Sequence, residues 1–455
     1  MFQRISKDKA FYRSLAVLSG PLILQNLLNN SLSMLDTFMV GNLGETALAG
    51  VTLANTVFFV VNLLIFGLQS GCMVLISQYW GKGDHATINR ILGIGFGLSS
   101  AVSLLVALVV TFFPIQVYSL TTSDPELVRV AAQYARIVAF SFFLNSMALI
   151  YIAAQRSMGN TKLGLVVLCS SMAANTFLNW VLIFGKFGFP AMGVEGAALA
   201  TLIARLIEVS ITAAYALRTD RFRLDLRLIL RPGFVIFKDF LRYSLPVVIN
   251  ETVWGIGFSL YAVIFGHMPN AVEGVAAYTI TQTIDRMLSA AYFGVGSAAS
   301  ILVGAPLGAG DREKAHTAGV TMLTVTFIFG IVGGLLLLLA TVFFVIPVLF
   351  PLFRAADETL RIGRTMLFIS AVVMPFRAFN FCNIVGVLRG GGDVRAGVFL
   401  DVGAMYGVAL PLAALSGLVF RAPVIVVYAC ISLEEVVKLF FGYWRFSQKK
   451  WLRNV

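Results

Sequence analysis

Charged residues are scarce in this sequence. Only 12% of its 455 residues are Asp, Glu, Lys or Arg, whereas 58% are hydrophobic. Soluble domains typically contain about 25% charged residues. Apolar runs long enough to cross a bilayer core about 30 Å thick recur along the whole chain. The runs lack the short alternating pattern of outer-membrane barrels. The composition therefore excludes a soluble globular protein and predicts an all-α polytopic membrane protein.

Residues and motifs for catalysis are also sparse. The three histidines, His85, His267 and His316, fall at or near expected loops, which leaves no intramembrane general base or metal triad. The four cysteines lie in apolar runs without a CxxC pair, as core residues do. No G-x-x-x-x-G-K-[ST] phosphate cradle is present, so an ATP-driven pump is not expected. We therefore expect neither an enzyme nor a cofactor, and an ion gradient as the energy source.

The apolar runs predict about twelve transmembrane helices. The expected spans of the first half are 15–40, 48–78, 91–117, 128–154, 163–185 and 193–217. Those of the second half are 240–266, 275–304, 316–346, 362–388, 395–419 and 422–444.

Basic residues are distributed unevenly between the loops. About 23 Lys and Arg fall on the side that holds both termini, and about 5 fall on the other, which by the positive-inside rule makes both termini cytoplasmic. Seven of them lie in the central segment 218–242. The net charge of +12 is explained by these short loops, so nucleic-acid binding is not expected.

The two halves of the chain repeat each other. SGPLIL at 19–24 matches SLPVVI at 244–249, and QRSMGN at 155–160 matches LRGGGD at 388–393. GLQSGCMVLISQYWGKGD, which starts at Gly67, matches GVGSAASILVGAPLGAGD, which starts at Gly294. Each unit holds six helices, an even number, so the repeats should be parallel. The predicted domains are an N-terminal lobe, a basic linker and a C-terminal lobe, at 1–217, 218–239 and 240–455.

Asp36 is the first candidate functional residue. It lies in the outer third of the first span, where a charge costs at least about 2.5 kcal/mol in the bilayer. A carboxylate there can exchange a proton for sodium or for a cationic substrate. The alternative is a structural carboxylate that only bonds a neighbouring hydroxyl such as Ser33.

Further candidates lie in other spans. Glu251 follows Pro246 in the seventh helix, where it is either a coupling acid or a polar helix contact. Asn175 and Asn179 share one helix face at i, i+4, and Thr201 follows in the next helix. Their oxygens suit a hard cation, although such amides also serve as packing contacts between helices.

Some membrane charges are expected to pair locally, and others are not. Arg205 with Glu208, and Glu434 with Lys438, have the spacing of helical ion pairs. Arg377 has no local partner, and the sequence leaves open Asp401 or an acid in another helix. Asp285 and Gln282 in the eighth helix join Arg377 as candidates for a substrate cleft or an ion pair.

The combined motifs resemble the multidrug and toxic compound extrusion (MATE) family. They are SGPLILQNLLNNSLSMLDTFMVG, the helix ending GKGD, QRSMGN with LRGGGD, NWVLIFG followed by GVEGAALAT, and LPVVINETVWGIGF. The resemblance covers the chain from end to end. It implies two six-helix lobes around a V-shaped cleft, and export coupled to inward sodium or proton flow.

The resemblance also implies roles for particular residues. Asp36, Asn175, Asn179 and Thr201 match an N-lobe cation site that would hold Na⁺, although some members have Asp where Asn179 stands. Glu251 resembles the seventh-helix acid of one bacterial branch. That branch has a tenth-helix acid that the stretch RAFNFCNIVGVLRG lacks, so a C-lobe cation site is not supported.

These observations predict a multi-pass, monomeric antiporter of a bacterial inner membrane, surrounded by lipid. It would export small, cationic, amphipathic compounds in exchange for Na⁺ or H⁺. The alternative is a flippase for lipids or lipid-linked oligosaccharides with a related two-lobed fold. A channel is a further alternative, and a membrane enzyme is the least favoured.

Overall fold

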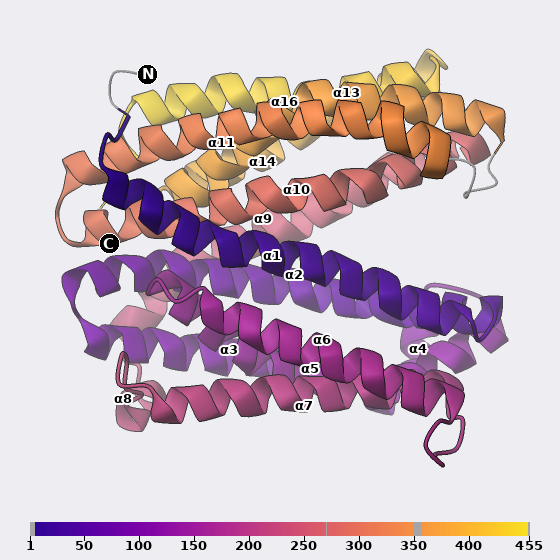
Figure 1. Ribbon diagram of the computed structural model, residues 1–455, viewed down its shortest axis with the longest axis horizontal. Coiled ribbons are helices and arrows are strands. Elements are labelled where there is room, and N and C mark those ends of the chain that lie inside the picture. Colours follow the sequence, from indigo (N-terminus) through magenta and orange to yellow (C-terminus); the bar gives the residue numbers. More distant parts are fainter. Residues whose placement is uncertain (1–4, 270, 350–355, 454–455) are drawn as a thin grey trace. The chain divides into compact units, whose positions relative to one another are not determined.

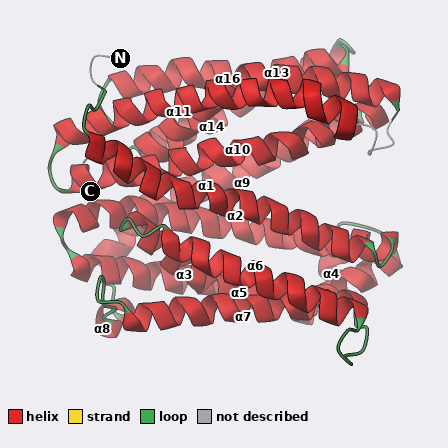
Figure 2. Cartoon of the chain, viewed as in Figure 1, coloured by secondary structure: helices red, strands yellow, loops and turns green. Residues whose placement is uncertain are grey.

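The computed structural model describes residues 5–269, 271–349 and 356–453. These residues form helices joined by short loops and contain no strand (Figures 1 and 2). The helices of the first half are α1 Lys9–Gly41, α2 Glu45–Lys82, α3 His85–Phe112, α4 Pro114–Ser119, α5 Pro125–Ser157, α6 Lys162–Phe184 and α7 Gly193–Arg218. A short helix, α8 Leu226–Leu230, lies in the segment that joins the halves.

The helices of the second half follow the same order. They are α9 Phe234–Gly266, α10 Ala271–Gly308, α11 Arg312–Ala340, η2 Thr341–Leu349, α13 Asp357–Phe381, η3 Cys382–Leu388, α14 Val394–Ala404, η4 Met405–Ala409, α15 Leu410–Ala414, η5 Leu415–Val419 and α16 Val424–Ser447. The η segments are wider π-helical turns that continue their α-helices. One of them directly precedes Arg389, and another begins four residues after Asp401.

Ten of these helical stretches are long and apolar enough to cross a membrane. Together with α1 and α16 they account for the twelve predicted spans. The predicted end of the third span, at 117, is wrong. Pro114 has no amide hydrogen to continue a helix and instead opens the separate helix α4, so α3 ends at Phe112.

By its internal contacts the chain divides into two compact units. The N unit is Leu28–Val248, and the C unit combines Met1–Leu27 with Ile249–Val455. The repeat boundaries predicted from the sequence, 1–217 and 240–455, differ in the placement of two helix halves. The first half of α1 belongs to the C unit, and the first half of α9 belongs to the N unit.

Two glycines at equivalent repeat positions allow the first half of α1 to pack in the C unit and the first half of α9 to pack in the N unit. In the N unit, a Cβ on Gly67 of α2 would lie 2.6 Å from the Val248 Cα of α9. In the C unit, a Cβ on Gly294 of α10 would lie 2.6 Å from the backbone nitrogen of Ile23 in α1. Val248 and Ile23 are themselves equivalent in the repeat. The same close backbone approach is therefore built once in each unit.

The loops that end the repeated helices also share one geometry. Gly83 and Gly310 have φ angles of 74° and 88°, in the left-handed region that glycine tolerates. In each loop the next residue donates its backbone N–H to the carbonyl five residues earlier in the chain: Asp84 to Tyr79, and Asp311 to Pro306. These are Schellman turns, and each aspartate then caps the following helix at φ −87° and ψ 81°. The internal repeat predicted from the sequence is confirmed.

The Asp84 cap has an electrostatic consequence. Its carboxylate accepts hydrogen bonds from the backbone N–H of Thr87 at 2.9 Å and from the Thr87 hydroxyl at 2.6 Å. Partial burial alone would raise the pKa of Asp84, but these hydrogen bonds outweigh burial and lower it below its usual value. Asp84 therefore remains an ionised helix cap at neutral pH.

The glycine contacts predict a matched loss of stability in both halves. Gly67→Ala and Gly294→Ala each place a methyl group against a neighbouring backbone, which should cost about 1–3 kcal/mol through overpacking. We expect each variant to unfold at a lower temperature in detergent than the parent protein. Gly97→Ala is the control, because a Cβ there meets no atom within 4 Å. Equal melting temperatures in all three variants would contradict the close approach.

Candidate functional site

Three of the predicted site residues meet in the N unit. Asn179 of α6 donates from Nδ2 to the Asp36 Oδ1 of α1 at 2.5 Å, and to Asn175 Oδ1 at 3.2 Å. The side chain of Asn179 is only 1% exposed, and Asn175 is also buried. The hydrogen bond to Asp36 thus comes from Asn179 on another helix, and a coupling role for Asp36 stays a prediction.

Asn179 also offers an unused acceptor. Its Oδ1 is buried and has no hydrogen-bond partner among the described residues. A buried carbonyl oxygen without a partner is costly and uncommon in folded proteins. In this arrangement the amide turns its N–H group toward the carboxylate and leaves its oxygen free. That oxygen is the type of ligand that a hard cation, a water or a protonated carboxyl would use.

Thr201 of α7 is linked to this group through a tyrosine. Its hydroxyl donates to the Ala197 carbonyl at 3.0 Å, so its lone pairs remain available as acceptors. Tyr134 of α5 is buried, interacts with the Thr201 side chain and lies within electrostatic reach of the Asp36 carboxylate. Tyr134 was not among the residues predicted from the sequence. No local motif marks it, because its role comes from the packing of α5 beside α7.

Asp36 forms no ion pair of its own with any cation among the described residues. Arg205 of α7 acts electrostatically on Asp36, but its guanidinium Nη1 donates to both Glu208 oxygens, at 2.7 and 2.8 Å. The predicted Arg205–Glu208 pair is therefore present, and the two charges offset each other. Among the described residues there is no group of three His, Cys, Asp or Glu side chains that could hold a metal ion. One carboxylate with neutral oxygens suits a proton or a monovalent cation better than a divalent metal.

Glu251 belongs to the C unit and is already paired. Arg389 donates from Nη2 to Glu251 Oε1 at 2.9 Å, and the Arg389 side chain is 2% exposed. Asn250 donates to Glu251 at 3.3 Å and to the Asp401 carboxylate of α14 at 3.1 Å. A cation that bound Glu251 would have to compete with a buried guanidinium. A coupling role for Glu251 stays a prediction.

The same network continues through α16. Lys438 donates to Asp401 Oδ1 at 2.5 Å and is ion-paired with Glu434, as the i, i+4 spacing predicted. Tyr261 of α9 donates to Glu434 Oε2 at 2.9 Å. Lys438 therefore lies between two carboxylates. The contact between Lys438 and Asp401 could not be predicted from the sequence, because the two residues lie on different helices.

Arg377 pairs with an acid of another helix. Its Nη1 is 2.5 Å from Asp285 Oδ2 of α10, and the Ser370 hydroxyl donates to the same oxygen at 2.9 Å. Gln282, one turn before Asp285, interacts with Tyr278. Asp401, the other partner considered for Arg377, is taken by Lys438. Of the predicted candidates, Asp285 and Arg377 thus form an ion pair.

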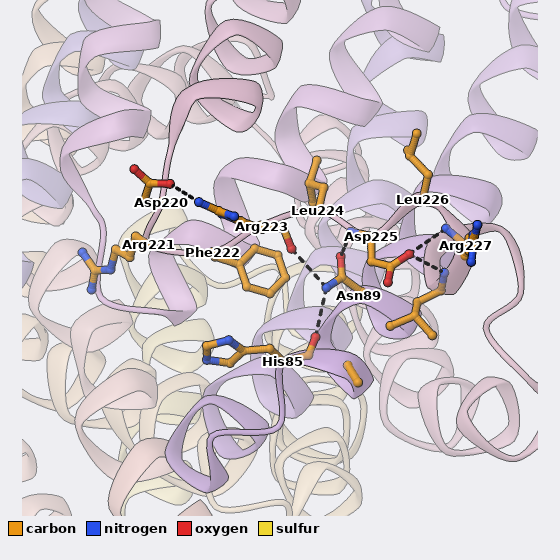
Figure 3. A pocket seen from close by; sticks show the side chains of 12 residues that line it. His85, Asn89, Asp220, Arg221, Phe222, Arg223, Leu224, Asp225, Leu226 and Arg227 are labelled. Carbon is orange, nitrogen blue, oxygen red and sulfur yellow. Dashed lines mark hydrogen bonds and ion pairs between the residues drawn. The ribbon is translucent and has the colours of Figure 1, made fainter.

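A recess of about 830 Å³ lies elsewhere in the N unit. It is formed by the start of α3 and the segment from Asp220 to Leu228, with His85, Asn89 and Asp225 around it (Figure 3). None of the predicted site residues lines it. Its walls carry both aspartates and arginines, so the recess itself selects neither charge.

The buried lysine generates a stability prediction. Lys438→Met removes the cation and leaves Asp401 and Glu434 buried beside each other, which should destabilise the C unit by about 3–5 kcal/mol. We expect a large fall in the melting temperature in detergent. The control is Arg223→Met, because the side chains of the Arg223–Asp220 pair are 83% and 86% exposed and such pairs contribute little. Similar melting temperatures for the two variants would contradict the role of Lys438.

Comparisons with known proteins agree with this architecture. A family model described as MatE matches residues 21–181 and 246–415, one segment in each repeat. The probable multidrug resistance protein NorM of Thermotoga maritima is 25% identical over 88% of this chain and 84% of its own length. The multidrug resistance protein MdtK of Yersinia pseudotuberculosis is 25% identical over 89% of this chain and 88% of its own.

A solved structure shares the fold. The eukaryotic MATE transporter AtDTX14 superposes with a TM-score of 0.84 at 22% identity, over 97% of this chain and 96% of that one. The family match spans both repeats and most of the chain. This multi-pass membrane protein therefore belongs to the MatE family of transporters and is not an enzyme.

Proposed function

We propose that this protein is a secondary active antiporter that exports small, cationic, amphipathic compounds in exchange for inward Na⁺ or H⁺. The coupling ion would bind at Asp36. The observation that carries the proposal is a buried amide, Asn179, which is hydrogen-bonded to Asp36 and has a free carbonyl oxygen. The names of the NorM and MdtK relatives support the export of drugs. The excess of basic residues in the loops on the side of the termini supports an orientation with both termini in the cytoplasm.

The coupling step would use a reversal of the Asn179 amide. When Asp36 is ionised and binds no ion, the Asn179 amide N–H faces the carboxylate, consistent with the distance of 2.5 Å between Asn179 Nδ2 and Asp36 Oδ1. A sodium ion or a proton on Asp36 needs an acceptor instead of a donor, so the amide must turn its oxygen inward. Asn175 Oδ1 then loses the Asn179 donor and becomes available, with Thr201, as a further cation ligand. Occupancy of Asp36 is thereby tied to a change in packing between α1 and α6.

The membrane potential supplies enough energy for this exchange. One charge that crosses 100 mV releases about 2.3 kcal/mol, which supports about 50-fold accumulation at full coupling. No ATP site is required.

A flippase remains the alternative function, and the charges of the C unit weigh against it. A phosphate headgroup would need cations that are not already neutralised. Arg377, Arg389 and Lys438 are each ion-paired with a carboxylate. The same reconstituted protein distinguishes the two functions: gradient-driven counterflow of a cationic dye supports the antiporter, and scrambling of a labelled lipid without a gradient supports the flippase.

Asp36→Asn tests the coupling site. The variant keeps the size of the side chain but has no negative charge to neutralise a cation and no carboxyl proton to release. In proteoliposomes, with sodium and pH gradients imposed separately, we expect ethidium transport by the parent protein under one gradient. We expect at least a tenfold loss in Asp36→Asn. Glu126→Gln is the control, because this acid is exposed at the start of α5. Undiminished coupled transport in Asp36→Asn would refute the proposal.

Asn179→Leu tests the amide reversal. Leucine has a similar volume but offers neither donor nor acceptor, so the coupling ion loses an oxygen ligand. We expect the ion concentration needed for half-maximal transport to rise about tenfold or more. Ser33→Ala, on the same turn as Asp36, should leave that concentration unchanged. If the two variants behave alike, the amide has no part in coupling.

A further inference from the structure

The segment between the two repeats is strongly basic. It contains five arginines and two aspartates from Arg218, the last residue of α7, to the start of α9. They are Arg218, Asp220, Arg221, Arg223, Asp225, Arg227 and Arg231. Both flanking helices are membrane spans, so a stretch this short must stay close to the membrane surface.

This segment is held in a fixed position on α3. Asn89 donates from Nδ2 to the Arg223 carbonyl at 3.3 Å, and the Asp225 N–H donates to Asn89 Oδ1 at 3.0 Å (Figure 3). One turn further along α3, a Cβ on Gly93 would lie only 2.0 Å from the Ile229 carbonyl oxygen of α8. The backbone of α8 therefore rests directly on α3. One side of α8 is packed on α3, so the residues on its opposite side are held in an exposed position.

The outward side of α8 is apolar. Leu226 and Leu230 share one face at i, i+4 and are 69% and 79% exposed. Phe234 and Val235, at the start of α9, are 79% and 72% exposed. Four large apolar side chains thus stand outside the packed core within ten residues of sequence. Exposed apolar patches of this kind mark interaction sites.

Two cations stand beside these side chains. Arg227 and Arg231 are exposed, and neither forms an ion pair with any carboxylate in the described part of the chain. The neighbouring arginines are already engaged. Arg223 pairs with Asp220 at 2.7 Å, and Arg221 donates to the Met158 carbonyl at 2.6 Å.

We propose that α8 and its flanks, residues 226–235, form a binding surface for anionic phospholipid. Arg227 and Arg231 would bind the phosphate of the headgroup, and the exposed leucines would enter the acyl region. Arginines beside exposed leucine and phenylalanine are typical of segments that lie in an anionic membrane interface. A soluble anion would explain the arginines but not the four apolar side chains. Lipid explains both, and the adjoining spans bring it within reach.

The test measures lipid binding without transport, so its failure is distinct from failure of the antiporter proposal. The full chain, purified in a neutral detergent, is titrated with phosphatidylglycerol or with phosphatidylcholine and analysed by native mass spectrometry. We expect tighter binding of phosphatidylglycerol. In the double variant Arg227→Gln/Arg231→Gln its affinity should fall about 30-fold, since each basic residue near an anionic surface contributes about fivefold.

Matched variants separate the contribution of Arg227 and Arg231 from that of positive charge elsewhere and from that of the leucines. Arg312→Gln/Lys314→Gln removes the same charge from the exposed first turn of α11 and should leave binding unchanged. Leu226→Ser/Leu230→Ser should weaken both lipids. The proposal is overturned if the Arg227/Arg231 variant keeps the preference for phosphatidylglycerol, or if the control variant loses it equally. It is also overturned if inorganic phosphate at the same concentration displaces the lipid, because the site would then take free anions.

Discussion

Charge neutralisation in an apolar interior is the constraint on which the rest of this structure depends. A buried charge without a partner costs several kcal/mol, so the spans pair their charges, some within one helix and others between helices. Glu208 has Arg205, Asp285 has Arg377, and Glu251 has Arg389. Lys438 is held between Asp401 and Glu434.

Asp36 departs from this pattern. Its hydrogen-bond partner is the neutral amide of Asn179, and the arginine that acts on it is already paired with Glu208. A carboxylate in such a place is stabilised only partly by its protein neighbours. The remaining stabilisation must come from water, a proton or a cation. In the proposed function, this is where a mobile ion would change the charge balance of the N unit.

Sequence reasoning succeeded where the chemistry is local or repeated. The repeat of the loops at Gly83 and Gly310 was visible in the sequence, although their Schellman geometry was not predicted, and the asparagine pair follows from the helical period. It could not find Tyr134 or the Lys438–Asp401 contact, because those depend on which helices pack together. The exchange of the α1 and α9 halves was also hidden. Gly67 and Gly294 matched as repeat partners, but a matched glycine does not reveal which backbone approaches it.

The repeat preserves backbone geometry, while its polar chemistry differs between the halves. The position of Asp36 is occupied in the second half by Tyr261, which donates to Glu434. The position of Glu251 is occupied in the first half by Asn26. Duplicated backbones with different charges let the N unit keep Asp36 without an ion pair among the described residues, while Glu251, Asp285, Asp401 and Glu434 of the C unit are each ion-paired. This difference favours a single coupling site. In the proposed coupling step, reversal of the Asn179 amide would serve a proton and a sodium ion equally well, so the choice between them would depend on how many further oxygens the ion can recruit. Asn175, hydrogen-bonded to Asn179, and Thr201 are the predicted candidates for these oxygens.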